Sequence, residues 1–175
     1  MTKIDIFSGF LGAGKTTLIK KLIAEAYAGE KLVLVENEFG EVGVDGAFMQ
    51  DAGIEVTEMN SGCICCSLSG DFTTALGMVL AQYAPDRILI EPSGVGKLSD
   101  VVQAVQNVGG DLAINAATTV ADAKKCKVYL KNFGEFYRNQ LENAHCIVLS
   151  RTAGLSQAKL DEALALIREC NAAAT

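Results

Sequence analysis

Residues 9–17 constrain the fold of this chain more than any other segment. They read G-F-L-G-A-G-K-T-T, and the first eight match the pattern G-x-x-x-x-G-K-[ST] without a mismatch. An apolar run at 4–7 precedes them, and an amphipathic pattern begins at Lys15. A glycine-rich turn between a strand and a helix points several backbone N–H groups at one anion. The segment therefore predicts a cradle for nucleotide phosphates, and the alternative, a turn without a ligand, requires a chance match of roughly 1%.

Each residue type in this cradle suits one part of a nucleoside triphosphate with its magnesium ion. The backbone amides that we expect to face the phosphate oxygens are those of Gly12, Ala13 and Gly14. Lys15 is expected to reach the β- and γ-phosphates, and the Thr16 hydroxyl is expected to bind Mg²⁺. Thr17 is placed for an α-phosphate contact or a helix cap. Phe10 and Leu11 are expected to pack the loop.

Short apolar runs alternate with amphipathic patterns along the chain. Runs with the length of strands buried on both faces occur at 4–7, 32–35, 88–90, 113–120 and 146–149. Helical patterns cover 15–28, 68–83, 98–108, 133–142 and 156–170. A further strand is expected within 54–59. Such alternation builds a mostly parallel sheet through right-handed crossovers, and 175 residues fit one domain. We predict an α/β fold, a three-layer α/β/α sandwich of the P-loop NTPase type.

A second nucleotide-binding element is predicted at residues 88–94, which read I-L-I-E-P-S-G. An apolar strand here ends in Glu91, and Gly94 follows three residues later. Carboxyl ends of parallel strands are where α/β sheets bind ligands. We expect Glu91 to hold a water molecule bound to Mg²⁺ and the Gly94 N–H to sense the γ-phosphate. The alternative is a strand-terminal glutamate that caps a turn.

Residues 36–46 combine four acidic residues with three glycines, and they begin at Glu36. Solvation explains the charges, whereas the glycines suit a loop that rearranges with the nucleotide state. We therefore interpret this segment as a switch.

Three thiols, those of Cys63, Cys65 and Cys66, follow a glycine within the segment N-S-G-C-I-C-C. Thiolates bind soft or borderline metals, but the spacing C-x-C-C is not that of a zinc ribbon. Metal binding, redox chemistry and a packed turn all remain open from the spacing. Three thiolates leave a four-coordinate ion one ligand short, and Glu36, water or a partner would complete it. The other cysteines are expected to be small buried apolar residues.

The charge balance argues against some classes of partner. Lys and Arg total 15 against 21 Asp and Glu, which gives a net charge of −6, and no basic run suits a nucleic-acid backbone. No apolar run has the length of a signal-peptide core or a membrane span. We expect a cytoplasmic protein that binds neither nucleic acid nor a membrane.

Taken together, these motifs resemble the CobW family of metallochaperone GTPases, relatives of the GTPases that assist nickel insertion into urease and hydrogenase. The resemblance rests on G-F-L-G-A-G-K-T-T, E-N-E-F-G-E-V-G-V-D, S-G-C-I-C-C and E-P-S-G, in that order. It implies slow hydrolysis of GTP to GDP, coupled to delivery of Zn²⁺ or Co²⁺ to a metalloprotein client or a cofactor pathway. It also implies that Cys63, Cys65 and Cys66 bind the transported metal, with Glu36 as a further ligand.

The chain departs from this family at residues 150–153. The family carries N-K-x-D there, and its Asp reads the guanine base, whereas this chain has S-R-T-A. Ser150 and Arg151 remain as expected base contacts, so GTP is our first choice and ATP the second. The family also continues beyond this point, so we expect residues 1–175 to be a nucleotide-binding domain truncated before its last strand and a C-terminal domain.

Two other hypotheses compete with the metallochaperone. One is an ATP-dependent redox activator that holds an iron–sulfur cluster on Cys63, Cys65 and Cys66, shared across a homodimer. The other is a nucleotide sensor without enzymatic activity that regulates a partner.

Overall fold

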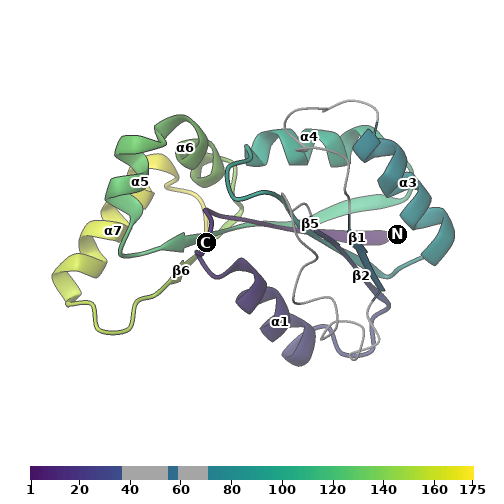
Figure 1. The fold of residues 1–175 in the computed structure, drawn as a ribbon, viewed down its shortest axis with the longest axis horizontal. Coiled ribbons are helices and arrows are strands. Elements are labelled where there is room, and N and C mark those ends of the chain that lie inside the picture. The colour runs from purple at the N-terminus through teal and green to yellow at the C-terminus, as the bar shows by residue number, and fades with distance from the viewer. Residues whose placement is uncertain (37–54, 59–70) are drawn as a thin grey trace.

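The computed structural model describes residues 1–36, 55–58 and 71–175, which form alternating strands and helices (Figure 1). The strands are β1 (Thr2–Ser8), β2 (Leu32–Glu36), β3 (Glu55–Glu58), β4 (Arg87–Glu91), β5 (Leu112–Asp122) and β6 (Cys146–Ser150). The helices are α1 (Lys15–Glu25), α3 (Asp71–Tyr83), α4 (Leu98–Val108), α5 (Cys126–Asn132), α6 (Gly134–Glu142) and α7 (Gln157–Cys170). The expected α/β alternation is confirmed.

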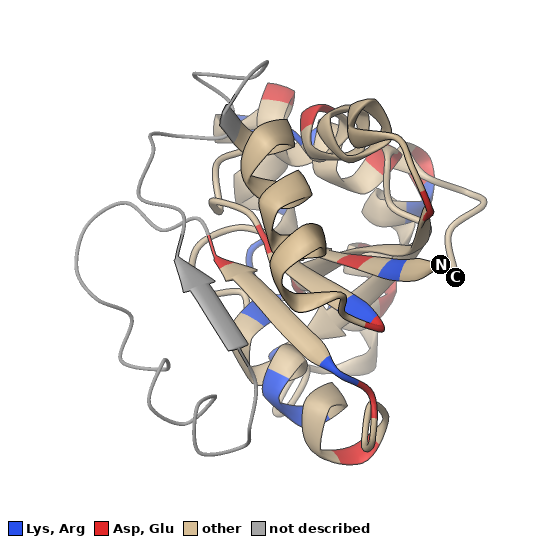
Figure 2. Ribbon diagram, turned by 90° about the vertical axis from the view of Figure 1, so that its right-hand side faces the viewer, with Lys and Arg blue, Asp and Glu red and all other residues tan. Residues whose placement is uncertain are grey.

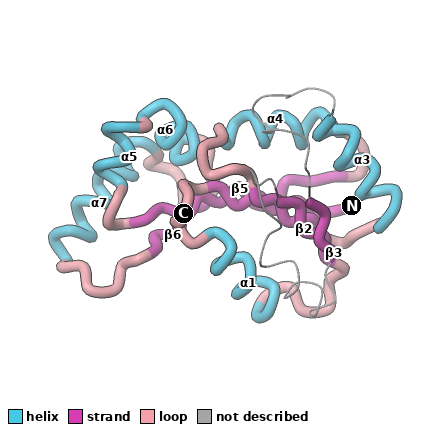
Figure 3. The backbone as a smooth tube through the Cα atoms, in the orientation of Figure 1, coloured by secondary structure: helices cyan, strands magenta, loops and turns pink. Residues whose placement is uncertain are grey.

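The strands gather into one sheet between the helices (Figure 3). Their order is β3-β2-β4-β1-β5-β6, and every pairing between the described strands is parallel. β1 lies between β4 and β5, so the segment that follows β1 emerges near the middle of the sheet. The chain crosses from β1 to β2, returns through β4 and then continues on the other side of β1 with β5. Parallel sheets bind ligands where the strand order reverses in this way.

Helices cover both faces of the sheet (Figure 1). The strand sequences supply an apolar side chain to each face in turn, because successive residues of a strand point to opposite sides. Val33 and Val35 pack in the core beneath α3 and α4, whereas Leu32 and Leu34 pack against α1. The helices α5, α6 and α7 pack on one another in a third core beside the ends of β5 and β6. The three-layer prediction is therefore confirmed.

Several element bounds differ from the sequence prediction. The strand expected within 54–59 is present as β3, and the strand expected at 113–120 is longer, Leu112–Asp122. The first helix ends at Glu25 rather than at residue 28, and the backbone N–H groups of Ala26 and Tyr27 both donate to the Leu22 carbonyl. The short helix α5 has no counterpart in the prediction, because two turns are too few for a clear apolar period.

A buried ion pair joins β1 to the start of β4. Arg87 donates hydrogen bonds to Asp5 and to Glu30, and Asp5 is only 1% exposed. The Tyr27 hydroxyl also donates to Asp5, over 3.0 Å, and its ring lies beneath the Arg87 guanidinium. Burial and the Asp5 charge raise the pKa of Tyr27, so its hydroxyl stays a donor.

No helix within the described ranges is long and apolar enough to cross a membrane. Figure 2 shows Lys and Arg segments interspersed with Asp and Glu along the ribbon. This distribution agrees with the sequence, in which acidic residues outnumber basic ones.

Candidate functional site

The carboxyl ends of the parallel strands meet at one edge of the sheet. The residues that end the five strands around the cradle are Ser8, Glu36, Glu91, Asp122 and Ser150. The sequence-predicted cradle, at residues 9–17, begins directly after the central strand β1. Most of the predicted site residues therefore belong to one region, although they lie up to about 140 positions apart in the sequence.

The cradle has a backbone that only glycine adopts without strain. Gly9, Gly12 and Gly14 have φ angles of 141°, 72° and 104°. A Cβ on Gly9 would lie 2.4 Å from the Val120 carbonyl oxygen, so β5 passes directly against the start of the loop. Gly14 is the N-cap residue of α1, and the first turn of α1 contains no acidic side chain. The amides at this helix N-terminus thus face no protein carboxylate from their own turn, as an anion site requires.

Three predicted side chains meet beside the cradle. The Thr16 hydroxyl lies 3.3 and 3.2 Å from the two Glu91 carboxylate oxygens, and Lys15 Nζ lies 3.7 Å from Glu91 Oε1. The Lys15 and Glu91 side chains are almost completely buried. A hydroxyl and a carboxylate at this separation are hard oxygen ligands, and they fit a magnesium ion held beside a triphosphate. The Lys15 ammonium has the positive charge that binding of a γ-phosphate would require.

The turn after Glu91 packs directly on the cradle. A Cβ on Gly94 would lie 2.7 Å from the Leu11 backbone nitrogen and 3.2 Å from the Phe10 carbonyl carbon. The turn closes with a hydrogen bond of 3.0 Å from the Gly96 N–H to the Ser93 carbonyl. Gly94 therefore lies where the sequence places a γ-phosphate contact, next to the loop that would hold the phosphates.

The two expected base contacts lie at the end of β6. Arg151 has a φ of 55°, and its guanidinium donates to the Gly12 carbonyl over 2.7 and 3.1 Å. Arg151 Nε also lies 3.5 Å from the buried Asp122 carboxylate. The Ser150 hydroxyl donates to the Ala121 carbonyl over 3.4 Å. Arg151 thus ties the end of β6 to the cradle, and Ala153 is exposed.

The predicted metal site is only partly within the described residues. Cys63, Cys65 and Cys66 lie outside them, as does the switch segment after Glu36. Glu36 is the last residue of β2 and pairs in register with Glu91 on β4. Residues paired across parallel strands lie on the same face of the sheet, so Glu36 lies on the same face as Glu91, at the same sheet edge. Among the described residues, no group of three or more His, Cys, Asp or Glu side chains is placed to hold a metal.

Phe10 anchors the cradle in an aromatic cluster that the sequence did not predict in detail. Its ring centroid lies 4.6 Å from that of Tyr129, 5.3 Å from that of Phe133 and 5.2 Å from that of Tyr137. Phe10 is only 5% exposed, whereas its neighbour Leu11 is 78% exposed. The expectation that Phe10 packs the loop is confirmed. The same expectation for Leu11 is wrong, because the Leu11 side chain points to solvent.

Gln140 on α6 is a site residue that the sequence analysis missed. Its side chain is buried beside Tyr137 and Leu141, yet it contacts the turn that follows Glu91. The available signal was a polar residue on the apolar side of an amphipathic helix, next to two large apolar residues. Such a residue needs hydrogen-bond partners in the interior.

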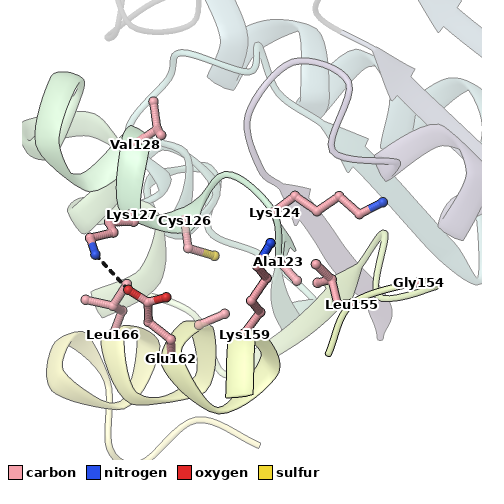
Figure 4. A pocket seen from close by; sticks show the side chains of 11 residues that line it. Ala123, Lys124, Cys126, Lys127, Val128, Gly154, Leu155, Lys159, Glu162 and Leu166 are labelled. Carbon is pink, nitrogen blue, oxygen red and sulfur yellow. Dashed lines mark hydrogen bonds and ion pairs between the residues drawn. The ribbon is translucent and has the colours of Figure 1, made fainter. Parts of the chain in front are cut away.

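A hollow of about 490 Å³ lies between the start of α5 and α7 (Figure 4). Cys126 and Lys159 line it, and an ion pair between Lys127 and Glu162 closes one side. Burial raises the pKa of the Cys126 thiol, so this side chain stays protonated. None of the predicted nucleotide or metal residues lines this hollow, so it is separate from the phosphate cradle.

The sheet order, the cradle after β1 and the carboxylate at the end of β4 define a P-loop nucleotide-binding domain of the α/β class. Residues 3–175 match the family model described as CobW/HypB/UreG, nucleotide-binding domain. The chain therefore belongs to the CobW/HypB/UreG family, and the resemblance noted from the sequence motifs is confirmed.

Two curated relatives come from Escherichia coli (strain K12). The chain is 34% identical to the zinc chaperone YeiR over 87% of its own length, and 31% identical to the zinc chaperone YjiA over 94%. These alignments cover 47% and 54% of the two relatives, so the chain spans about half their length. It is also 29% identical, over 95% of its length, to the zinc-regulated GTPase metalloprotein activator 1 of Schizosaccharomyces pombe, of which 42% is covered.

Solved structures share the fold. The hydrogenase maturation factor HypB from Archaeoglobus fulgidus superimposes with a TM-score of 0.69 at 18% identity, over 99% of this chain and 79% of HypB. A Zn(II)-bound YjiA GTPase superimposes with a TM-score of 0.65 at 23% identity, over 97% and 54% of the two chains. These likenesses confirm the predicted P-loop fold.

Proposed function

We propose that this protein binds a nucleoside triphosphate, first of all GTP, hydrolyses it slowly, and couples hydrolysis to delivery of a transition metal. The observation that carries the proposal is the cluster of Lys15, Thr16 and Glu91 beside the glycine cradle. The names of the relatives support zinc as the metal and GTP as the nucleotide, because these relatives are zinc chaperones and a zinc-regulated GTPase.

In the proposed reaction, water attacks the γ-phosphate in line. The Lys15 ammonium and the cradle amides stabilise the negative charge that develops on the transferred phosphoryl group. Thr16 and Glu91 would hold Mg²⁺, which neutralises charge on the phosphate oxygens when bound. The sequence offers no dedicated catalytic base, so we expect slow intrinsic turnover.

The base preference is proposed to depend on the end of β6. Arg151 supports a purine contact, because its guanidinium stands at the cradle end of the site and stacks readily on planar rings. Ala153 offers no carboxylate for guanine. We therefore propose GTP as the preferred nucleotide and ATP as a second substrate.

Delivery of Zn²⁺ or Co²⁺ is proposed to use Cys63, Cys65 and Cys66 with Glu36. Two of the superimposable YjiA structures are Zn(II)-bound, which supports zinc as the transported metal. The register pairing of Glu36 with Glu91 supports coupling between the metal site and the nucleotide site. A shift of one strand end would move the other, because the two residues are paired across adjacent strands. These names favour zinc over the iron–sulfur alternative.

The cargo passes to a metalloprotein client in the cytoplasm, and we propose that the protein acts as a homodimer. We also propose a further strand beside β6. Its support is the pairing of Thr175, whose N–H donates to the His145 carbonyl and whose carbonyl accepts from the Ile147 N–H. The greater length of the curated relatives agrees with a further domain.

The test is a titration of non-hydrolysable GTP and ATP analogues into the full-length protein, with and without zinc. We expect tighter binding of the GTP analogue, and a change of nucleotide affinity in the presence of zinc. Serine replacement of Cys63, Cys65 and Cys66 should abolish the zinc effect and leave nucleotide binding in zinc-free buffer intact. Zinc binding that is unchanged in the triple serine variant would contradict the metal site.

A further inference from the structure

The side chain of Gln140 holds the turn that follows Glu91. Gln140 lies on α6 and is 0% exposed. Its side-chain amide donates to the Gly94 carbonyl over 3.1 Å and to the Gly96 carbonyl over 2.8 Å. Both amide hydrogens therefore bind backbone oxygens on either side of the turn, 46 and 44 residues earlier in the sequence.

The helix that carries Gln140 is itself fixed to the sheet and to the cradle. The Thr119 hydroxyl on β5 donates to the Gln140 backbone carbonyl over 2.7 Å. Tyr137, one turn earlier on the same side of α6, packs against the ring of Phe10 in the cradle. The same helix thus contacts the loop expected to hold the phosphates and the turn expected to sense the third one.

The orientation of the Gln140 amide points to a role for its donors. Its Oε1 atom is buried and has no hydrogen-bond partner in the described part of the chain. An unpaired buried acceptor is unfavourable. Rotating the amide by 180° would place Oε1 against two carbonyl oxygens, so the two N–H groups fix the orientation. The Gln140 side chain is therefore oriented so that its N–H groups hold the turn, although its Oε1 atom is then left without a hydrogen bond.

A small movement of this turn changes the position of Gly94 relative to the cradle. On one side Gly94 already touches the Leu11 backbone, which a Cβ would meet at 2.7 Å. On the other side Gln140 holds its carbonyl. The Gly94 N–H belongs to the residue held between these two contacts, and its distance to a γ-phosphate depends on both.

We propose that Gln140 is a positioning residue that sets the preference of this site for a triphosphate over a diphosphate. It acts by fixing the turn at residues 93–96 so that the Gly94 N–H meets the γ-phosphate. This inference rests on the proposed function, because it assumes that the cradle holds a triphosphate. Gln140 lies outside both phosphate motifs, so its effect on the triphosphate can be measured without changing either motif.

The test compares Gln140→Met with Thr119→Val in the full-length protein. Methionine has nearly the shape of glutamine and lacks its donors, whereas Thr119→Val removes the other polar contact of the same residue and leaves the turn untouched. We would measure the Kd of a non-hydrolysable GTP analogue and of GDP, both with Mg²⁺, and the Tm of each variant. A Gln140→Leu variant, which is also apolar and has no hydrogen-bond donor, repeats the test if Gln140→Met does not fold.

We expect Gln140→Met to reduce the ratio of the GDP Kd to the GTP-analogue Kd about tenfold, with GDP binding changed less than about twofold. Thr119→Val should keep the wild-type ratio even where its Tm falls. An unchanged ratio in Gln140→Met, or an equal loss of affinity for both nucleotides, would overturn the inference. Either result would leave the proposed function standing. Wild-type protein that binds both nucleotides equally would also overturn the inference, whereas wild-type protein that binds neither nucleotide would overturn the proposed function.

Discussion

Arg151 and Ala153 lie in the segment that we expect to read the nucleotide base, and their side chains offer different contacts. Arg151 keeps a cationic side chain that binds the Gly12 carbonyl of the cradle. Ala153 has lost the carboxylate, and no side-chain group of Ala153 can accept a hydrogen bond. Arg151 therefore contacts the cradle, whereas Ala153 offers no acceptor to a bound base.

We predict that Ala153→Asp increases the preference for GTP over ATP. A carboxylate that accepts two hydrogen bonds from guanine contributes about 1–3 kcal/mol, which corresponds to a tenfold to hundredfold change in the affinity ratio. The measurement is the Kd of fluorescent GTP and ATP analogues. Thr152→Ala, next to it in the chain, is the control and should leave the ratio as it is. An unchanged ratio in Ala153→Asp would show that the base lies elsewhere.

A substitution of Gly94 tests the close contact between the cradle and the turn that follows Glu91. The three nearest atoms that a Cβ would meet belong to the backbone of Leu11 and Phe10, so movement of a flexible side chain would not relieve this contact. We predict that Gly94→Ala lowers triphosphate affinity at least about tenfold, because the cradle or the turn must shift. Gly134→Ala is the matched control, since nothing lies within 4 Å of its added Cβ. Isothermal titration of both variants would check this, and wild-type affinity in Gly94→Ala would refute it.

At the scale of elements, α5 and α6 form the wall against which the cradle is packed. Phe10 reaches from the cradle into the rings of Tyr129, Phe133 and Tyr137. The position of the loop therefore depends on two helices that follow β5, more than 110 residues later in the chain. A loop whose conformation is fixed before its ligand arrives loses less entropy on binding.

We predict that Phe10→Ala destabilises the protein by about 3–5 kcal/mol, since it removes a buried aromatic ring from the cluster. Leu11→Ala, at the exposed neighbouring position, should change the unfolding free energy by less than about 0.5 kcal/mol. Urea unfolding monitored by circular dichroism measures both. Equal effects of the two substitutions would contradict the aromatic anchor.

At the scale of the whole molecule, the ion pair of Arg87 and Asp5 ties β4 to β1 inside the protein. Arg87 starts β4, whereas the cradle and Glu91 lie at the opposite, carboxyl ends of these strands. The pair belongs to the framework that keeps the strands in register. Removing one partner leaves the other charge buried without compensation.

We predict that Arg87→Met costs about 3–5 kcal/mol of unfolding free energy, because Asp5 is left without a cation. Adding Asp5→Asn to this variant should recover part of the loss, since the unpaired charge is then gone. Chemical unfolding of the two single variants and the double variant gives the coupling energy. Additive losses in the double variant would show that the two charges do not depend on each other.

Glu30 makes part of this stabilisation depend on pH. The hydrogen bond from Arg87 lowers the pKa of Glu30 below its ordinary value of 4.5. A carboxylate with a lowered folded-state pKa stabilises the protein above the ordinary value, and this contribution is lost as the pH falls through the folded value. Glu30→Gln should therefore be less stable than wild type at neutral pH, and the difference should shrink below pH 4.5.

Unfolding free energies measured across this pH range check the prediction. The exposed Glu25→Gln on α1 is the control, with a difference from wild type that should stay small throughout. A Glu30→Gln difference that grows on acidification would have the wrong sign.

The cradle, the alternation of strands and helices, and the carboxylate of Glu91 at a strand end could all be predicted from the amino-acid sequence. These features depend on neighbouring residues, because glycine conformation, side-chain periodicity and a strand-to-helix turn are local properties. The motif order also determined the family, which the family model confirmed over residues 3–175. The cysteine site stays a prediction, since Cys63, Cys65 and Cys66 lie outside the described residues.

The distant groups that hold the cradle could not be predicted and became visible in the three-dimensional fold. Periodicity marks Gln140 as a residue on a buried helix face, but it does not say that its amide binds the carbonyls of Gly94 and Gly96. Nor does it place Phe10 among rings from α5 and α6, or Arg151 on the Gly12 carbonyl. The physical reason is that hydrogen bonds and packing between elements depend on how the layers assemble, and no local pattern records that assembly.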